Sequence, residues 1–189
     1  ILIPHRLSVQ HLLVHKLLTA VGLSMGTSPQ TDSERIILES AAPFLMPQML
    51  ENDEDHDIGA YMAPEPYGSQ AVAMGIADRL CTSDSLWKDH PCCGFVIQKR
   101  IETSHGNALE ELVRHFFQSA QILDTQINAH QLDRETLDFV QTFLGQEHAV
   151  VRQALLASGI RYSPEKLFPD REKLDIIQTY LTDTMGLIT

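Results

Sequence analysis

The chain has 189 residues, of which 43% are hydrophobic and 21% are charged, and its formal net charge is −11. These values are those of an ordinary globular domain. The excess of acidic residues argues against a surface that binds nucleic acid. The apolar runs are short and interrupted, so the sequence predicts no membrane-spanning segment. The three cysteines form an odd count that fits no disulfide framework, which favours a reducing, cytoplasmic setting.

Helical spacing of apolar residues dominates the first half of the chain. Ser8 is the expected N-cap of a first helix that ends near Gly22. A second helix is expected over residues 34–50, where two prolines would kink or break it. An acidic, proline-rich connector over residues 51–68 follows this second helix. Its composition predicts turns rather than a regular element.

The second half of the chain continues the helical pattern. Further helices are expected over residues 70–82, 95–128, 133–159 and 170–181. Asp133 and Asp170 are the expected N-caps of the last two helices. Alternation with a period of two residues is almost absent, so the sequence predicts an all-α, multi-helix bundle. We expect one domain over residues 1–189, with an N-terminal helical part (1–82) and a C-terminal bundle (95–189).

Glu147 interrupts the apolar stripe of the helix that is expected over residues 133–159. Its neighbours in this stripe, such as Leu144 and Val151, are hydrophobic. A carboxylate in an apolar helix seam must be paired, protonated or bound to a metal, because burying it bare costs several kcal/mol. The spacing therefore predicts that the Glu147 side chain lies inside the protein with a partner of opposite charge.

Several glutamates and histidines on the expected helices are candidate partners for Glu147 around a metal. Glu102 and His105 stand three residues apart, which puts both side chains on one helix face, as in helical di-metal sites. The candidate metal ligands are Glu102, His105, Glu111, His115, Glu147 and His148. The metal expected for these carboxylate and imidazole groups is iron or manganese. Because a full di-metal site has two Glu-x-x-His pairs and this chain has one, solvated pairs without a metal stay an open alternative.

Two parts of this region resemble known families of metal enzymes. Residues 107–160, with His115-Phe116-Phe117 and Phe143-Leu144-Gly145-Gln146-Glu147, are similar to the helix pair of predicted metal-dependent hydrolases of ferritin-like character. The stretch from Glu147 to Leu181 is also similar to haem-oxygenase-like non-haem iron enzymes. The first resemblance implies that Glu147 is a metal ligand. In that family a histidine would follow three residues later, where this chain has Val150.

Three further polar clusters have both a functional and a structural explanation. The acidic turn Asp53–Gly59 resembles a calcium loop but lacks the closing glutamate, so a solvated turn is favoured. A second cluster consists of Cys81, His90, Cys92 and Cys93. It offers zinc ligands or a nucleophilic thiol with a histidine base, although adjacent cysteines are expected to point in different directions. His11 and His15 stand four residues apart on the first helix and either bind a metal or haem, or pack at its edge.

The sequence supports two hypotheses about function, and whether the chain is an enzyme stays open. The first is a helical non-haem metal protein that oxidises or hydrolyses a small, partly apolar substrate. The second is a metal-free helical module that binds a partner protein or a small ligand, with Glu147 paired to Arg114, Arg152 or a backbone donor. Because long amphipathic helices often bury a spare face against a second copy, a homodimer is expected.

Overall fold

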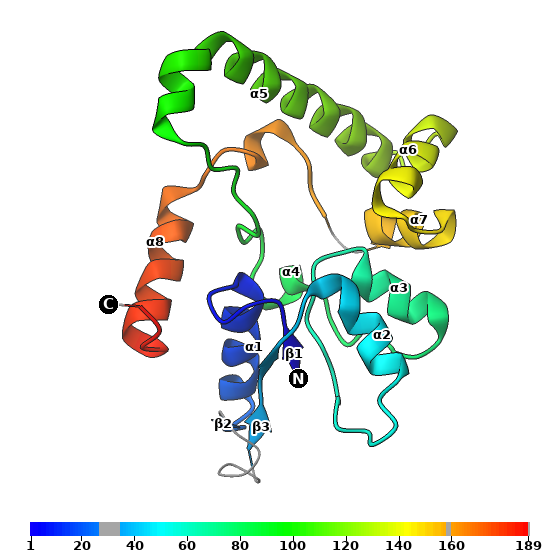
Figure 1. Ribbon diagram of the computed structural model, residues 1–189, viewed down its shortest axis with the longest axis vertical. Coiled ribbons are helices and arrows are strands. Elements are labelled where there is room, and N and C mark those ends of the chain that lie inside the picture. Colours follow the sequence, from blue (N-terminus) through cyan, green and yellow to red (C-terminus); the bar gives the residue numbers. More distant parts are fainter. Residues whose placement is uncertain (27–34, 158–159, 189) are drawn as a thin grey trace.

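The computed structural model describes residues 1–26, 35–157 and 160–188, and its fold is mostly helical (Figure 1). These residues form eight α-helices and two pairs of short parallel strands. In chain order the elements are β1 (Leu2–Ile3), α1 (Val9–Ala20), β2 (Met25–Gly26), β3 (Ile36–Ile37), β4 (Glu39–Ser40), the 3-10 turn η1 (Pro43–Leu45), α2 (Met46–Glu51), α3 (Tyr67–Met74), α4 (Ser83–Leu86), α5 (Lys99–Asn128), α6 (Arg134–Leu144), α7 (His148–Ala157), the 3-10 turn η2 (Pro164–Lys166), α8 (Arg171–Thr179) and the π-helical turn η3 (Tyr180–Thr184). The prediction that helices dominate is confirmed, but a purely all-α bundle is wrong because it omits the parallel strands.

Strand β1 is the centre of a small parallel arrangement of three segments. Leu2 pairs with Glu39 of β4 on one side and with Tyr61 on the other. The Glu39 N–H donates to the carbonyl oxygen of Ile1, and the Met62 N–H donates to that of Leu2, both over 3.0 Å. Helix α1 lies between β1 and β4 in the chain and provides the crossover that two parallel neighbours need.

The prediction of a second helix over residues 34–50 is wrong in its first part. Among the residues of this range that the structure describes, β3, β4 and η1 precede the helix, which begins only at Met46. Two consecutive isoleucines, Ile36 and Ile37, form β3, as expected for β-branched residues on a pleated strand. Pro43 is the first residue of η1, where its missing N–H is tolerated.

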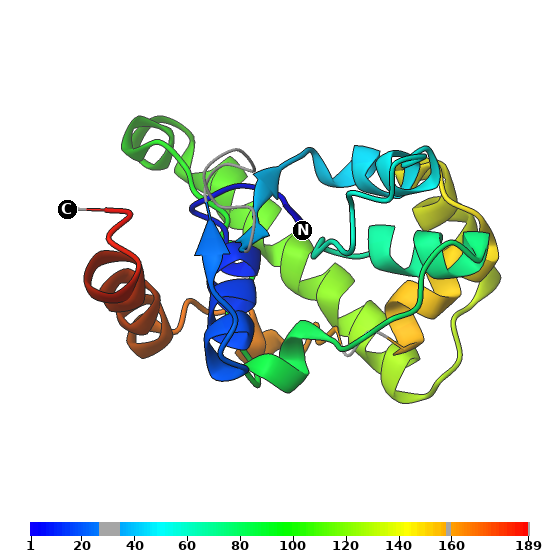
Figure 2. The same ribbon diagram turned by 90° about the horizontal axis from the view of Figure 1, so that it is seen from below.

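Helix α1 is covered on two sides and joins the strands to the C-terminal helix. On one side Val14 and Leu18 pack against Ile3 of β1. On the other side Leu13 packs against Leu181 of η3, within a cluster that also includes residues of α4 and α8. Figure 1 shows α1 between β1 and the C-terminal α8, and Figure 2 shows α1 and α8 in the same half of the molecule. The first helix is therefore the centre of the core in this half of the molecule.

The long helix α5 leads from this half of the molecule to a second helical cluster. Helices α6 and α7 pack at its C-terminal end, where Ile127, Leu137, Val151 and Leu155 form a buried cluster. Helix α7 also contacts α3, so the cluster is attached to the part of the chain that contains the strands. Within the described residues, no helix combines the length and the apolar character that a bilayer span needs.

The helix predicted over residues 133–159 is in fact two helices, because Gly145 ends the first one. Gly145 has a φ of 64°, and its N–H donates to the Gln141 carbonyl oxygen over 2.8 Å. The Gln146 N–H donates to the same carbonyl oxygen over 3.2 Å, which is a left-handed C-cap. The turn changes the direction of the chain, so the apolar stripe of α6 does not continue through Glu147.

We expect Gly145→Ala to lower the free energy of unfolding by about 1 kcal/mol, because a Cβ is strained at this positive φ. Gly106→Ala in α5 is the matched control, since a Cβ there meets no described atom within 4 Å. Alanine favours the helix over glycine, so this control should raise the free energy of unfolding by about 0.5 kcal/mol. Urea denaturation measures the free energy of unfolding of both variants. Equal effects of the two changes would contradict the C-cap assignment.

Candidate functional site

The carboxyl ends of β1, β4 and the Tyr61 segment lie at the same edge of the parallel arrangement. Residues 4–8 lead from β1 into α1, residues 41–42 lead from β4 into η1, and residues 63–66 lead from the Tyr61 segment into α3. Since the segments are parallel, all three loops leave on the same side. In open parallel sheets, the crevice outside the carboxyl ends of the strands is the usual place for a ligand.

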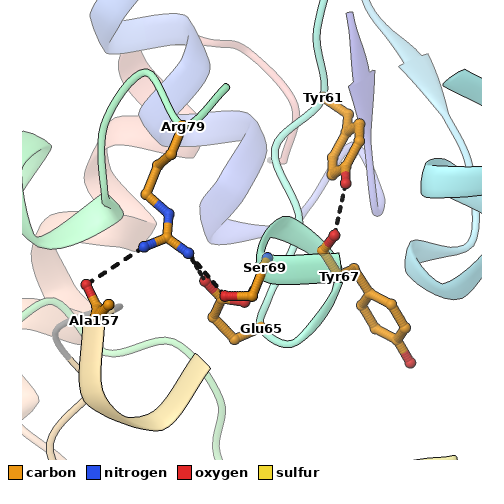
Figure 3. Close-up of polar contacts among 6 residues, drawn as sticks. All are labelled: Tyr61, Glu65, Tyr67, Ser69, Arg79 and Ala157. Carbon is orange, nitrogen blue, oxygen red and sulfur yellow. Dashed lines mark hydrogen bonds and ion pairs between the residues drawn. The ribbon is translucent and has the colours of Figure 1, made fainter. Parts of the chain in front are cut away.

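A polar cluster of three side chains fixes the loop before α3 (Figure 3). Glu65 Oε1 lies 2.9 Å from Arg79 Nη2, and these side chains are only 15% and 24% exposed. The same Arg79 nitrogen donates to Ser69 Oγ over 2.8 Å, and the Ser69 N–H donates to Glu65 Oε2 over 3.0 Å. Arg79 Nη1 also donates to the carbonyl oxygen of Ala157 in α7 over 3.5 Å. These contacts therefore cap the start of α3, pair the Glu65 carboxylate with a positive charge and join α3 to α7.

Two tyrosines fix the first turn of α3 against the neighbouring β segment. The Tyr61 hydroxyl donates to the carbonyl oxygen of Tyr67 over 2.7 Å. Burial, and after it the negative charge of Glu65, raise the pKa of Tyr61 to about 12, so its hydroxyl stays a donor at neutral pH. In Figure 3 the Tyr67 ring points away from the Glu65–Arg79 pair. Its phenol therefore stays outside the cluster, at the start of α3.

The loop before α1 brings a positive charge to the same edge. Ser8 Oγ accepts from the His11 N–H over 3.1 Å, which confirms Ser8 as the predicted N-cap. His11 is buried, and its Nδ1 donates to the carbonyl oxygen of Arg6 over 2.5 Å. Arg6 is exposed, and so are two apolar residues of this edge, Leu7 and Phe44. A cation, the positive end of α1 and apolar surface are thus placed on neighbouring loops.

The histidine pair of the first helix is explained by packing. His15 Nδ1 lies 2.9 Å from the Tyr180 hydroxyl, whereas His11 bonds to the carbonyl oxygen of Arg6 in the loop before α1. Burial, and after it the charge of His11, lower the pKa of His15.

The acidic turn over Asp53–Gly59 is held by hydrogen bonds to its own backbone. The Asp53 carboxylate accepts from the N–H groups of Asp57 and Ile58, over 3.2 and 2.8 Å.

The predicted metal ligands on α5 are exposed to solvent. Glu102 and His105 are both exposed, and His105 has a non-helical φ of −138°. The regular three-residue spacing that would align these two side chains is therefore lost. Glu111 and His115 form an exposed pair, with Oε1 and Nε2 3.9 Å apart. The exposure of these four side chains fits the alternative explanation of solvated Glu–His pairs without a metal.

Glu147 and His148 lie where α7 begins, and the prediction that Glu147 is buried in a helix seam is wrong. Glu147 is exposed and precedes the helix, and its carbonyl oxygen accepts from the Val151 N–H over 3.0 Å. His148 Nε2 lies 2.9 Å from Asp138 Oδ1, and this contact is an ion pair when the imidazole is protonated. In residues 1–26, 35–157 and 160–188, no group of three or more His, Cys, Asp or Glu is placed to hold a metal ion.

The cysteines are free thiols, and two of them lie together. Cys81, Cys92 and Cys93 are exposed, and the Sγ atoms of Cys92 and Cys93 are 3.8 Å apart. The expectation that these two side chains point in different directions is wrong. His90 Nδ1 bonds to the Trp87 carbonyl oxygen over 2.8 Å. Cys92 is exposed as a residue, but partial burial of its sulfur, and after it the neighbouring Cys93, raise the pKa of its thiol to about 11, so at neutral pH this thiol is mostly protonated.

A family model described as the NMT1-like family matches residues 3–137, which is more than half of the chain. The chain belongs to the NMT1-like family. It is a substrate-binding family of the periplasmic-binding-protein type, and its members bind small-molecule ligands. The matched residues include all three loops of the edge and the Glu65–Arg79 pair. No curated protein and no solved structure gives a significant match.

Family membership corrects the first hypothesis about function. The similarity to ferritin-like and haem-oxygenase-like enzymes is wrong, and so is the assignment as a non-haem iron oxidoreductase or hydrolase. The ferritin-like similarity depended in part on the stretch Phe143–Glu147, which is a helix end and a turn rather than a helix interior. The second hypothesis, a protein that binds a small ligand, fits the family. Binding of iron or manganese, a homodimer, a single domain and a cytoplasmic location stay predictions.

Sequence analysis did not find Glu65, Tyr67 or Arg79. The available signal was the stretch Pro64-Glu65-Pro66-Tyr67, because proline and acidic residues are typical of the start of a helix. These residues belong to the predicted acidic, proline-rich connector over residues 51–68, for which the sequence predicts turns. Nothing local marks Arg79 as the partner of Glu65, since the two are fourteen residues apart and the ion pair depends on how α3 packs.

Proposed function

We propose that this chain binds a small organic anion at the edge formed by the carboxyl ends of β4, β1 and the Tyr61 segment. The observation that carries the proposal is the position of β1 between two parallel neighbours, whose following loops leave on one side. Membership of a family that binds small-molecule ligands supports the same conclusion.

The charges at this edge favour an anion although the whole chain is acidic. The nearby carboxylate of Glu65 is neutralised by Arg79, so it opposes an incoming anion less than a free carboxylate would. Arg6 is exposed on the loop before α1, and the N-terminal end of α1 carries a partial positive charge. A carboxylate or phosphate group of a ligand can therefore contact Arg6 by a charge-assisted hydrogen bond.

The apolar side chains at this edge indicate the rest of the ligand. Phe44 at the start of η1 is 63% exposed, and Leu7 before α1 is 49% exposed. Tyr67 is half-buried at the start of α3. Ligand sites are lined mainly by apolar and aromatic side chains, with a few polar groups that orient the ligand. We therefore expect an anion that also carries an apolar or aromatic part.

A thermal-shift panel of small carboxylates, phosphates, amines and neutral analogues tests this proposal. Aromatic or branched anions should raise the Tm, whereas their amide or amine analogues should not, because only the anions pair with Arg6. Arg6→Gln should weaken the best anion about 10- to 100-fold in titration calorimetry, as expected for loss of a hydrogen bond to a charged group. Tyr67→Ala should also weaken it.

Arg134→Gln is the control for charge, because the Arg134 side chain is 91% exposed on α6. It removes one positive charge outside the proposed site, so the affinity should stay within about twofold of the unchanged protein. Equal losses for Arg6→Gln and Arg134→Gln would mean that binding depends on net charge alone. An Arg6→Gln variant with unchanged affinity would contradict the proposed site.

A further inference from the structure

Cys92 and Cys93 form a vicinal pair of free thiols on the segment between α4 and α5. Both residues are exposed, and their Sγ atoms are 3.8 Å apart. Gln10 Nε2, on the first turn of α1, lies 3.7 Å from Cys92 Sγ and donates to it. This contact orients one sulfur from outside the segment. Neither thiol has a role in the proposed binding of an anion.

The separation of the two sulfurs suits chelation of one atom. Two sulfurs that each lie about 2.3 Å from one tetrahedral metal ion are about 3.8 Å apart, which is the separation observed here. A disulfide would instead need an S–S length of about 2.05 Å. The pair can therefore hold a shared atom between its sulfurs without a large rearrangement of the side chains.

The surroundings decide which kind of atom fits. A structural zinc ion needs four protein ligands. In the described part of the chain, however, no third His, Cys, Asp or Glu joins these thiols in a group that could hold a metal. Soft, thiophilic centres select thiolate ligands, and trivalent arsenic is satisfied by two of them plus its own substituent. We propose that Cys92 and Cys93 together bind a thiophilic centre of this kind through both sulfurs, each of which loses its proton as its bond forms.

The reaction with a trivalent arsenical is balanced without an oxidant. With phenylarsine oxide, both S–H bonds break and two As–S bonds form at the same arsenic atom. The arsenical oxygen leaves with both protons as water, and arsenic keeps its oxidation state. The product is a small ring that includes the Cys92–Cys93 peptide bond. The same two thiols would hold a soft metal ion as thiolates, with release of two protons.

Phenylarsine oxide and the reduced full chain provide the test, with native mass spectrometry as the measurement. The chain should take up one phenylarsenic group that resists excess 2-mercaptoethanol and is removed by 2,3-dimercaptopropanol. Because the second As–S bond forms within the molecule, the chelated adduct should resist a monothiol about 100-fold better than a single-thiol adduct. Cys92→Ser and Cys93→Ser should each lose this resistance.

Cys81→Ser is the matched control, because Cys81 is an exposed free thiol that is not adjacent to another cysteine. It should keep the monothiol-resistant adduct in full. Circular dichroism checks that each serine variant keeps the fold, which is expected because the three residues are exposed. The proposal would be overturned by an adduct that 2-mercaptoethanol removes from the unchanged chain. It would also be overturned by a Cys92→Ser or Cys93→Ser variant that keeps a resistant adduct.

Discussion

Arg79→Met is expected to lower the free energy of unfolding by about 3 kcal/mol, because it leaves a poorly exposed carboxylate without its cation. The Glu65 side chain is 15% exposed and lies 2.9 Å from the guanidinium that would be lost. The buried Ser69 hydroxyl would also lose the donor that lies 2.8 Å away. Methionine keeps much of the side-chain volume, so the loss reports on charge and hydrogen bonds. Urea denaturation followed by circular dichroism measures the change.

Arg134→Met is the control for this prediction. Arg134 Nε lies 3.5 Å from Asp138 Oδ2, but the Arg134 side chain is 91% exposed. Exposed ion pairs contribute little, so this change should cost less than about 0.5 kcal/mol. Adding Glu65→Gln to Arg79→Met should recover part of the loss, because the unpaired charge is then removed. If Arg79→Met costs no more than Arg134→Met, the cluster does not hold α3 in place.

Leu13→Ala is expected to lower the free energy of unfolding by about 3 kcal/mol, the typical cost of a cavity at a fully buried leucine. Leu13 is 1% exposed and packs on the side of α1 that faces Leu181 of η3 and Trp87 beyond α4. The change removes contacts that hold the C-terminal helix to the first one. Thermal or urea denaturation measures the loss.

Leu80→Ala is the control for the cavity, because Leu80 is 88% exposed. An exposed leucine has little area to lose, so its truncation should stay within about 0.5 kcal/mol of the unchanged protein. A small effect of Leu13→Ala, similar to that of Leu80→Ala, would mean that α8 and η3 do not pack on α1 in solution.

Helix starts were the most predictable features of this fold. Ser8, Asp133 and Asp170 each cap a helix, as predicted, and the Asp133 and Asp170 side chains accept from the N–H groups of Thr136 and Lys173. A capping side chain bonds to an N–H group three residues later, so both groups lie within one short window of sequence. For this reason a single sequence is enough to locate such a cap.

The strands and the helix end at Gly145 were not predictable in the same way. A strand of two residues, such as β1 or β4, is too short to show alternation, and its pairing joins residues far apart in the chain. Gly145 did give a local signal, since glycine is common just after the end of a helix. The apolar residues on both sides continue the helical spacing, however, and this spacing predicts one helix through Gly145.

The candidate site was the least predictable part, because its residues come together only through the fold. Arg6 stands on the loop after β1, whereas Phe44 in η1 and Tyr67 at the start of α3 stand just beyond the loops that follow β4 and the Tyr61 segment. Their common edge depends on parallel pairing that no local pattern shows. Glu147, the acidic residue that the apolar spacing singles out, is exposed because a turn places it outside the helix.

Hydrogen–deuterium exchange with and without the anion that raises the Tm most is the most direct test of binding at this edge. If the ligand binds there, amide exchange should slow in residues 4–8 and 62–67 and stay unchanged in α6 and α7. Slower exchange confined to α5, α6 and α7, with residues 4–8 and 62–67 unaffected, would place the ligand in the helical cluster and contradict the account.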